Sequence, residues 1–244
     1  MPDVLRVEGL TKRYGAYTAV DGLSFAIGER EVLGLLGQNG AGKSTAIKLL
    51  CNLARPTAGQ AWLDGVPILG ARSAAHRRKL GVMVESPRFY PQLSGRDNLR
   101  LLARLQGVAP ERVERMLAQV GLVDRAGERF DRFSMGMKQR LGLAAVFLHQ
   151  PSLIILDEPT TGLDPVGRNQ IHDLIATLAA EHAVSILLCS HHLSEVERLC
   201  QRAIVMDHGR LILEQSLREP GGIGAVDKVF RDLAAQLTEQ REIA

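Results

Sequence analysis

The sequence predicts an α/β protein, with a core of alternating strands and helices, an antiparallel β flank and an inserted α-helical subdomain. A glycine-rich loop lies between an apolar strand pattern at 32–36 and a helical pattern at 46–50. Apolar runs typical of buried parallel strands recur at 153–156, 184–189 and 203–206. Between the two parts of this alternating pattern, residues 96–149 are helical in pattern and rich in Arg and Leu.

The length and the composition suit one domain of two lobes. The chain has 244 residues, of which 45% are hydrophobic, enough to bury a core. We expect a single domain in which 1–85 and 151–213 form the α/β core, 86–150 the helical subdomain and 214–244 a tail helix. No apolar run approaches the ~18 residues that span a bilayer, and the N-terminus lacks the apolar segment of a signal peptide. We therefore expect a cytoplasmic chain.

Charge and cysteine usage narrow the classes of partner. The net charge of +3 is too small to indicate binding to nucleic acid. One local basic cluster, Arg72 to Lys79, favours a solvated helix face over contact with anionic lipid headgroups. Cys51, Cys189 and Cys200 show no C-x-x-C spacing, so we expect reduced and mostly buried thiols rather than disulfides or a zinc site.

The N-terminal part predicts two antiparallel strands beside the glycine-rich loop. Residues 4–10 and 18–27 alternate between polar and apolar side chains, as half-buried strands do. Tyr14 lies between these segments. An aromatic ring here can stack on an adenine base; a core or surface tyrosine is the alternative, and the nearby loop favours stacking.

The loop itself predicts a polyphosphate site. It consists of Gly37, Gln38, Asn39, Gly40, Ala41, Gly42, Lys43, Ser44 and Thr45, and it matches G-x-x-x-x-G-K-[ST] in full. Its glycines let successive N–H groups point at one spot, and the positive end of the following helix attracts an anion. Lys43 would reach the β- and γ-phosphates, and Ser44 would ligate Mg²⁺. A turn that binds nothing is disfavoured because the strand–loop–helix context is also correct.

The remaining elements follow in order. After the loop come a short strand and turn at 60–65 and a buried strand at 80–84. The helical subdomain has patterns at 98–105, 111–120 after Pro110, and 138–148. The α/β core then resumes with strands and helices at 153–156, 165–181, 184–189, 193–200 and 203–206. Asp207-His208-Gly209 predicts a hairpin turn into 210–213, and 226–237 a terminal amphipathic helix.

Two adjacent carboxylates follow the apolar strand at 153–156. In an alternating α/β core, ligand groups are delivered at this end of a strand. Asp157 can hold Mg²⁺ through water, while Glu158 can face the γ-phosphate and polarise a water for in-line attack. A turn or a helix cap is the alternative use of such a pair, and the phosphate loop favours the catalytic interpretation.

Several further motifs agree with one family. The stretch 133–140, Phe-Ser-Met-Gly-Met-Lys-Gln-Arg, resembles the ABC signature, and 161–165, Thr-Gly-Leu-Asp-Pro, resembles the D-loop. Ser190-His191 resembles the switch histidine, Tyr14 the adenine-stacking aromatic, and Glu85 occupies the Q-loop position. From Leu5 to about Leu213 the chain therefore resembles the ATP-binding subunit of an ABC transporter. The signature is the specific part, because most other P-loop enzymes lack it.

The resemblance implies a RecA-like P-loop NTPase core and hydrolysis of ATP with Mg²⁺. It also implies a head-to-tail dimer, with ATP between the phosphate loop of one copy and the signature of the other. Ser134 and the Gly136 N–H, at a helix start, would form that second anion site in trans. His191 would bind the γ-phosphate and the attacking water, and Asp164 would belong to the dimer contact.

A separate transmembrane permease is the second implied partner. The region of Phe89 and Tyr90, which we expect to be exposed, resembles the part that meets the permease. Glu85 would couple to this region and is also a potential Mg²⁺ ligand. The implied location is the cytoplasmic face of the inner or plasma membrane, through the permease.

Two departures from the commonest motifs refine the resemblance. Met135 and Met137 replace a Gly and a Gln of the signature, and Glu85 replaces the usual Gln. The Glu-Ser-Pro form at 85–87, together with this signature, is similar to bacitracin-resistance and lantibiotic-immunity exporters. Export of a drug, a peptide antibiotic or a lipid-like molecule is implied, while the cargo itself is not encoded in this chain.

Two rival functions are disfavoured. A soluble mechanical ABC ATPase needs a long coiled coil or two cassettes in one chain, and neither fits this length. A catalytically silent nucleotide-binding scaffold is the other rival. The chain keeps the four residues that catalysis needs, namely Lys43, Asp157, Glu158 and His191.

Overall fold

The computed structural model describes residues 3–69, 78–84 and 87–242, with side chains described as far as Leu233. The chain divides into two compact units. The first comprises Met1–Arg77 and Ser185–Ala244, and the second Arg78–Val184. Within the described ranges, no helix has both the length and the apolar character needed to cross a membrane.

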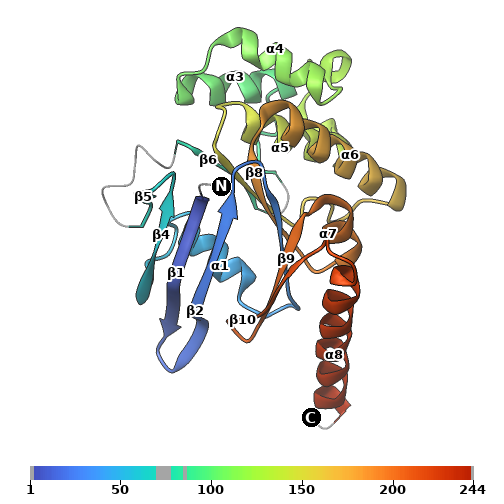
Figure 1. The fold of residues 1–244 in the computed structure, drawn as a ribbon. Coiled ribbons are helices and arrows are strands. Elements are labelled where there is room, and N and C mark those ends of the chain that lie inside the picture. Colours follow the sequence, from blue (N-terminus) through green and yellow to red (C-terminus); the bar gives the residue numbers. More distant parts are fainter. Residues whose placement is uncertain (1–2, 70–77, 85–86, 243–244) are drawn as a thin grey trace. The chain divides into compact units, whose positions relative to one another are not determined.

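The first unit contains the predicted antiparallel flank. Its strands β1 (Asp3–Tyr14), β2 (Tyr17–Gly28), β4 (Ala58–Leu63) and β5 (Val66–Pro67) form an antiparallel sheet in the order β2-β1-β4-β5. The first three run side by side in Figure 1. Tyr14 pairs with Tyr17 where β1 turns into β2, so the aromatic residue ends a strand instead of lying in a loop.

Three parallel strands in the same unit position the loop that contains the predicted phosphate site. β3 (Val32–Leu36) lies between β8 (Ser185–Ser190) and β9 (Arg202–Asp207) and runs parallel to both. All residues of β3 and β8 are buried, as their continuous apolar runs predict for strands covered on both faces. Leu36 is in register with Ser190, so the loops that follow β3 and β8 leave the sheet at the same edge.

The other elements of the first unit complete this core. β10 (Arg210–Ser216) pairs antiparallel with β9 through the predicted hairpin, in which His208 and Gly209 both have positive φ angles. The helices are α1 (Lys43–Leu50), α7 (Leu193–Leu199) and α8 (Gly222–Glu242). The tail helix therefore begins earlier than 226, and a strand and a turn occupy residues 214–221.

The second unit holds the helical part of the chain. A pair of parallel strands, β6 (Leu80–Val84) and β7 (Leu153–Asp157), is joined by α3 (Gly95–Gln106), α4 (Pro110–Gln119) and α5 (Met135–Phe147), with short 3-10 turns at Val123–Arg125 and Phe130–Arg132. The helix α6 (Pro165–His182) follows β7. In this unit α3 and α4 lie side by side, as Figure 1 shows.

The two strands of this pair, β6 and β7, differ in burial. Every residue of β7 is buried, as predicted. The prediction of a buried strand at 80–84 is wrong in part, because Val84 is 41% exposed and only Gly81 and Met83 are buried. β6 is the last strand of its sheet, and an edge strand has no neighbour on one side to cover it.

The helices of the second unit begin where local chemistry favours a start. The Ser94 hydroxyl accepts the Asp97 N–H at the first turn of α3, and Pro110 occupies the first position of α4. At the C-terminal end of α5, the Arg112 guanidinium donates to the carbonyl oxygens of Phe147 and Leu148. These contacts satisfy backbone groups that a helix end leaves without partners.

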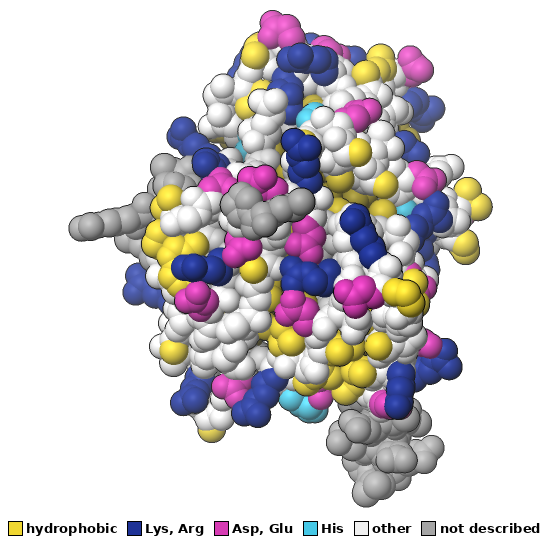
Figure 2. Space-filling model, viewed as in Figure 1, with side chains coloured by type: hydrophobic (Ala, Val, Ile, Leu, Met, Phe, Trp, Pro, Cys, Tyr) yellow, Lys and Arg dark blue, Asp and Glu magenta, His cyan; other side chains and the backbone are white. Residues whose placement is uncertain are grey.

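The prediction of mostly buried thiols is confirmed, because Cys189 and Cys200 are buried and Cys51 is half-buried. Most of the basic cluster at 72–79 lies outside the described residues. On the face drawn in Figure 2, the basic and acidic side chains of the described residues are interspersed.

Candidate functional site

The phosphate loop is shaped by its glycines and by its own hydrogen bonds. The Ala41 N–H donates to the Gln38 carbonyl oxygen across 3.1 Å, which closes the loop into a tight turn. Gly42 has a φ angle of 103°, and a Cβ there would lie 2.5 Å from the Ala19 carbonyl oxygen. A side chain at this position would therefore be both strained and in collision with backbone. The sequence pattern requires glycine at 42 for this physical reason.

Lys43 lies inside the curve of the loop. Its side chain is buried, with 7% exposed, and its ammonium group donates to the carbonyl oxygens of Gly37 at 2.6 Å and Gln38 at 3.3 Å. An ammonium has three donors, so these two bonds do not exhaust it. A buried cation held by neutral carbonyls is stabilised further by an anion.

The first turn of α1 has the properties of an anion site. Its N-cap residue, Gly42, supplies no side-chain cap, and no acidic residue occupies the turn. The N–H groups at a helix start and the helix dipole both favour a negative ligand, so these residues fit a polyphosphate. Ser44 is exposed in this turn and Thr45 is half-buried.

The chemistry of the oxygen donors fits Mg²⁺. Ser44 and Asp157 carry hard oxygen atoms, which this cation prefers, and Mg²⁺ commonly takes its other ligands from substrate phosphates and water. The described residues contain no group of three or more His, Cys, Asp or Glu side chains that could hold a metal ion. Ser44 in the first unit and Asp157 in the second therefore each carry the kind of oxygen that Mg²⁺ binds.

The base-stacking candidate lies at the β1–β2 turn. The Tyr14 ring is 50% exposed, and the Lys12 ammonium lies 4.7 Å from its centroid. This cation–π contact fixes the ring from one side. Stacking of adenine on Tyr14 remains a prediction.

The loop after β8 is held by a buried pair. The Ser190 hydroxyl donates to Glu195 Oε2 at 2.8 Å and accepts the His192 N–H at 2.9 Å. His191 is half-buried, and its ring centroid lies 3.9 Å from that of His192. Because Ser190 is in register with Leu36, His191 follows its strand at the edge from which the phosphate loop also leaves.

In the second unit, the two adjacent carboxylates differ in backbone and burial. Asp157 ends β7 and is buried, while Glu158 is half-buried with a φ angle of 51°. This left-handed conformation is rare outside glycine and asparagine, and such residues concentrate at functional sites. The Glu158 carbonyl accepts the Thr161 N–H at 3.2 Å, which turns the chain sharply after the strand.

The signature segment forms the start of α5. Ser134 is exposed, and its hydroxyl accepts the Met137 N–H at 3.3 Å as the N-cap. A Cβ at Gly136 would meet no atom within 4 Å, so the first turn faces open space there. A Cβ at Gly162 would lie 3.6 Å from Met135 Cε, so the signature and the D-loop segment are close within this unit.

Asp164 has a structural task that the sequence analysis missed. Its carboxylate accepts the Gly167 N–H at 3.1 Å and caps α6, with Pro165 at the first helical position. The signal was available, because Asp followed by Pro at the start of a helical pattern is a typical N-terminus. Its part in a dimer contact remains a prediction.

The region proposed to meet a permease is anchored by another missed residue. Asn98 is buried and holds Tyr90 by two bonds, accepting its N–H at 2.9 Å and donating to its carbonyl at 3.1 Å. Tyr90 is 61% exposed, as expected. The expectation for Phe89 is wrong, because its ring is half-buried and packs edge-on against Phe130 with centroids 5.1 Å apart. Glu85, the other residue assigned to this region, lies outside the described residues.

Comparison with known proteins gives one consistent family. A family model described as ABC transporter matches residues 20–161. The bacitracin transport ATP-binding protein BcrA of Enterococcus faecalis is 41% identical over 90% of this chain and 71% of its own length. The lantibiotic transport ATP-binding protein SrtF of Streptococcus pyogenes is 37% identical over 94% of this chain and 96% of its own length. Among solved structures, CbiO1 from Clostridium perfringens, part of the ABC transporter complex CbiONQ, has a TM-score of 0.85 and 27% identity, covering 100% of this chain and 99% of its own.

Proposed function

The chain belongs to the ABC transporter family as an ATP-binding subunit, and from this premise we propose that it uses Mg²⁺-dependent ATP hydrolysis to power export through a separate membrane permease. The observation that carries the proposal is the buried Lys43 ammonium inside the glycine loop, at a helix start with no side-chain cap. Subunits of this family bind ATP and are ATPases.

The phosphate loop is proposed to hold the nucleotide. Backbone N–H groups of residues 37–45 bind the phosphates, Lys43 pairs with the β- and γ-phosphates, and Tyr14 stacks on the adenine. Ser44 and Asp157 would hold Mg²⁺, with Glu85 as a third proposed ligand, and the bound cation would neutralise charge on the phosphate oxygens.

Two residues are assigned to the hydrolytic step. Glu158 polarises the attacking water as a general base, and His191 positions that water and the γ-phosphate. The left-handed backbone of Glu158 supports its assignment, because residues held in sparsely populated backbone conformations concentrate at functional sites. The register of β8 with β3 supports that of His191.

A second copy of the chain is the proposed partner for catalysis. Ser134 and the Gly136 N–H would contact the nucleotide held by the other copy, and Asp164 would belong to the contact between copies. The exposed Ser134 and the open space at Gly136 support this role, because the first turn of α5 is accessible to a ligand. Ser134 and Gly136 have no charged side chain. The nucleotide that they contact would therefore be held by Lys43 of the other copy.

The permease is the second proposed partner. The segment Phe89–Tyr90 is held by Asn98 beside a cavity of about 340 Å³ lined also by Leu101 and Leu102, which offers apolar surface with a fixed backbone. Tyr90 would insert into the permease and place the chain on the cytoplasmic side of the membrane. Export is favoured because the relatives named for bacitracin and lantibiotic transport are similar over most of this chain. The proposed organisation remains one ATPase domain with 86–150 as its helical subdomain.

A trapped dimer tests the proposal. Glu158→Gln should keep ATP and Mg²⁺ binding and remove the base, lowering turnover by about 10²–10⁴-fold. An ATP-bound dimer should accumulate and be seen by size-exclusion chromatography with light scattering. Glu181→Gln, which changes an exposed carboxylate at the end of α6, is the matched control and should hydrolyse ATP as the wild type does. Normal hydrolysis by a monomeric Glu158→Gln protein would contradict the assignment.

A further inference from the structure

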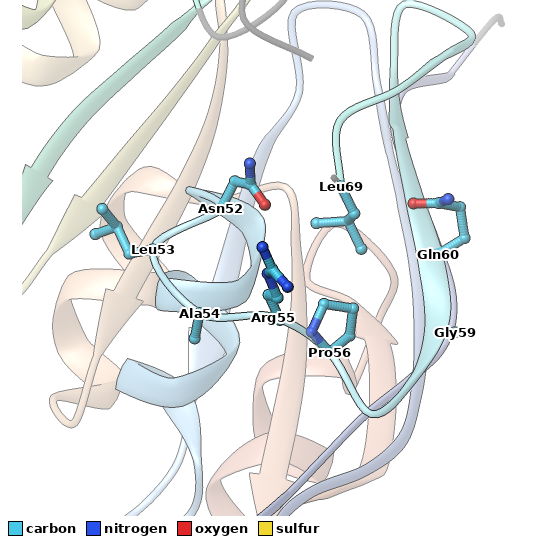
Figure 3. Close-up of a pocket in the computed structure, with 8 residues that line it drawn as sticks. All are labelled: Asn52, Leu53, Ala54, Arg55, Pro56, Gly59, Gln60 and Leu69. Atoms are coloured by element: carbon cyan, nitrogen blue, oxygen red, sulfur yellow. The ribbon is translucent and has the colours of Figure 1, made fainter. Parts of the chain in front are cut away.

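A second cavity lies in the first unit, at the opposite end of α1 from the phosphate loop. Its volume is about 630 Å³, within the range of small-molecule sites. The turn Asn52–Pro56, which follows α1, forms one wall, and Gln60 of β4 together with Leu69 forms the other (Figure 3). The function proposed above does not use this cavity.

Among the described residues that line the cavity, charge is carried by Arg55 alone. Its guanidinium forms no hydrogen bond or ion pair with the residues that the structure describes. Figure 3 shows the Arg55 side chain between the two walls, with Asn52 above it in the view and Leu69 between it and Gln60. The Gln60 oxygen accepts the Ala61 N–H at 3.0 Å, which leaves its NH₂ group for a ligand.

These groups select a class of ligand. A guanidinium offers a planar fork of donors that matches a carboxylate or a phosphate, and the Gln60 NH₂ group adds a neutral donor. Leu53, Pro56 and Leu69 supply apolar surface around this polar set. No aspartate or glutamate is among the described lining residues, so none of these residues would repel an anion. The donor set fits an anionic head on an apolar body.

The wall that carries Arg55 is held in place before any ligand arrives. The N–H groups of Leu53 and Ala54 both donate to the Lys48 carbonyl, at 2.8 and 3.1 Å, and the Lys12 ammonium donates to the Arg55 carbonyl at 2.8 Å. A fixed backbone lowers the entropy lost when a ligand is bound. The guanidinium is therefore presented on a preorganised turn.

The turn that carries Arg55 is connected to two residues of the proposed nucleotide site, Lys43 and Tyr14. The turn continues directly from α1, whose first residue is Lys43, and the ammonium that holds Arg55 also lies 4.7 Å from the Tyr14 ring centroid. We propose that this cavity is an effector site for a small soluble anion, a carboxylate or a phosphate ester with an apolar body, and that its occupancy is coupled to nucleotide binding. The coupling rests on the proposed function, whereas binding of the anion does not.

Binding is tested on the full chain without nucleotide. Octanoate and octyl phosphate should produce saturable amide shifts that are largest at residues 52–60 and at Leu69 in NMR spectra, and octylammonium should not. Arg55→Gln should weaken binding by about tenfold or more, because a charge-assisted bond is lost. Lys48→Gln removes the same charge from a neighbouring exposed residue that does not line the cavity, and it should bind within about twofold of the wild type.

Three outcomes would overturn the site. They are equal binding of octanoate and octylammonium, unchanged binding in Arg55→Gln, and Arg55-dependent binding of phosphatidylglycerol vesicles without binding of the soluble probes. The last would assign the same anion chemistry to a lipid headgroup instead of a soluble molecule.

Coupling is tested by measuring the affinity for a non-hydrolysable ATP analogue with and without saturating octanoate. We expect a change of about fivefold or more, and the same factor in octanoate affinity when the analogue is present, because coupling between sites is reciprocal. Lys12→Met should bring this factor close to one, since it removes the contact between the turn and Tyr14. An unchanged analogue affinity would overturn the coupling. If octanoate binds and the analogue does not, the proposed function fails alone; if the analogue binds and octanoate does not, this inference fails alone.

Discussion

The starts of α1 and α5 are both helix N-termini with a small residue at the cap, yet they are built differently. Gly42 caps α1 with no side chain, and the buried Lys43 ammonium lies next to that first turn. Ser134 caps α5 with its own hydroxyl, which accepts the Met137 N–H, and the first helical position, which Lys43 holds in α1, is held here by Met135. The first terminus is suited to hold a polyphosphate alone. The second has satisfied part of its own donor set and is suited to complete a site whose charge is supplied elsewhere.

Removing the cation of the first terminus should have the largest effect. Lys43→Ala loses a charge-assisted hydrogen bond to phosphate, about 1.5–3 kcal/mol, so ATP affinity should fall by about 10- to 150-fold, with hydrolysis falling as well. Lys138→Ala is the matched change in α5, where the ammonium lies 5.4 Å from the Phe130 ring centroid. ATP binding to the monomer, measured by calorimetry, should be unchanged in that variant. Equal losses in the two variants would erase the difference between the termini.

The hydroxyl of the second terminus should matter only for hydrolysis. Ser134→Ala should leave the ATP affinity of the monomer unchanged and lower dimer-dependent phosphate release by about tenfold, as expected when a bond to a charged phosphate is lost. It also removes a helix cap, at a cost of about 1 kcal/mol in the free energy of unfolding. Ser94→Ala removes the same kind of cap from α3 and should show the stability loss without the loss of hydrolysis. A fall in monomer affinity would mean that Ser134 contacts its own nucleotide.

Replacing Gly136 by alanine should raise the stability of the protein and lower its activity. Because a Cβ at 136 meets no atom within 4 Å, Gly136→Ala should raise the free energy of unfolding by about 0.5–1 kcal/mol. The methyl group would occupy the space proposed for a partner's nucleotide, so phosphate release should fall. Gly224→Ala in α8, where a Cβ also meets open space, should stabilise the protein without this loss. Urea unfolding and phosphate release should be measured on both variants. A Gly136→Ala protein that releases phosphate as fast as the wild type would contradict the proposed contact with the other copy's nucleotide.

Acid should weaken the unit that carries the second terminus. Burial, with the nearby Arg112 charge, lowers the pKa of His149 and of His182 from the ordinary value of 6.5. Both histidines bind protons more readily when the chain is unfolded, so their contribution to stability is full above pH 6.5 and is lost as the pH falls through the lowered values. The free energy of unfolding should decrease in that window, and less so in a His149→Gln/His182→Gln double variant. His208→Gln, at the exposed hairpin turn, is the control and should keep the wild-type pH dependence.

Much of the candidate site was predictable because it depends on short segments. The loop 37–45 matches its pattern at every required position, and the apolar runs of β3, β7 and β8 differ from the helical periodicity around them. The buried Asn98 was not predicted, because its value lies in bonds to Tyr90, a residue on another segment that pattern analysis cannot join to it. The burial of Phe89 was missed for the same reason, since Phe130 supplies the covering ring.

The sequence by itself determined the element types, the phosphate loop and the family, because backbone periodicity, glycine conformation and motif spacing are local properties. Only the tertiary structure decided that the Lys43 ammonium is bonded to the loop carbonyls, that Glu158 takes a left-handed backbone, and that β8 is in register with β3. It also decided that Lys12 joins Tyr14 to the turn of Arg55. Such contacts depend on how strands and turns that are far apart in the chain pack against one another. The free energy that favours one packing arrangement over the others comes from the whole core.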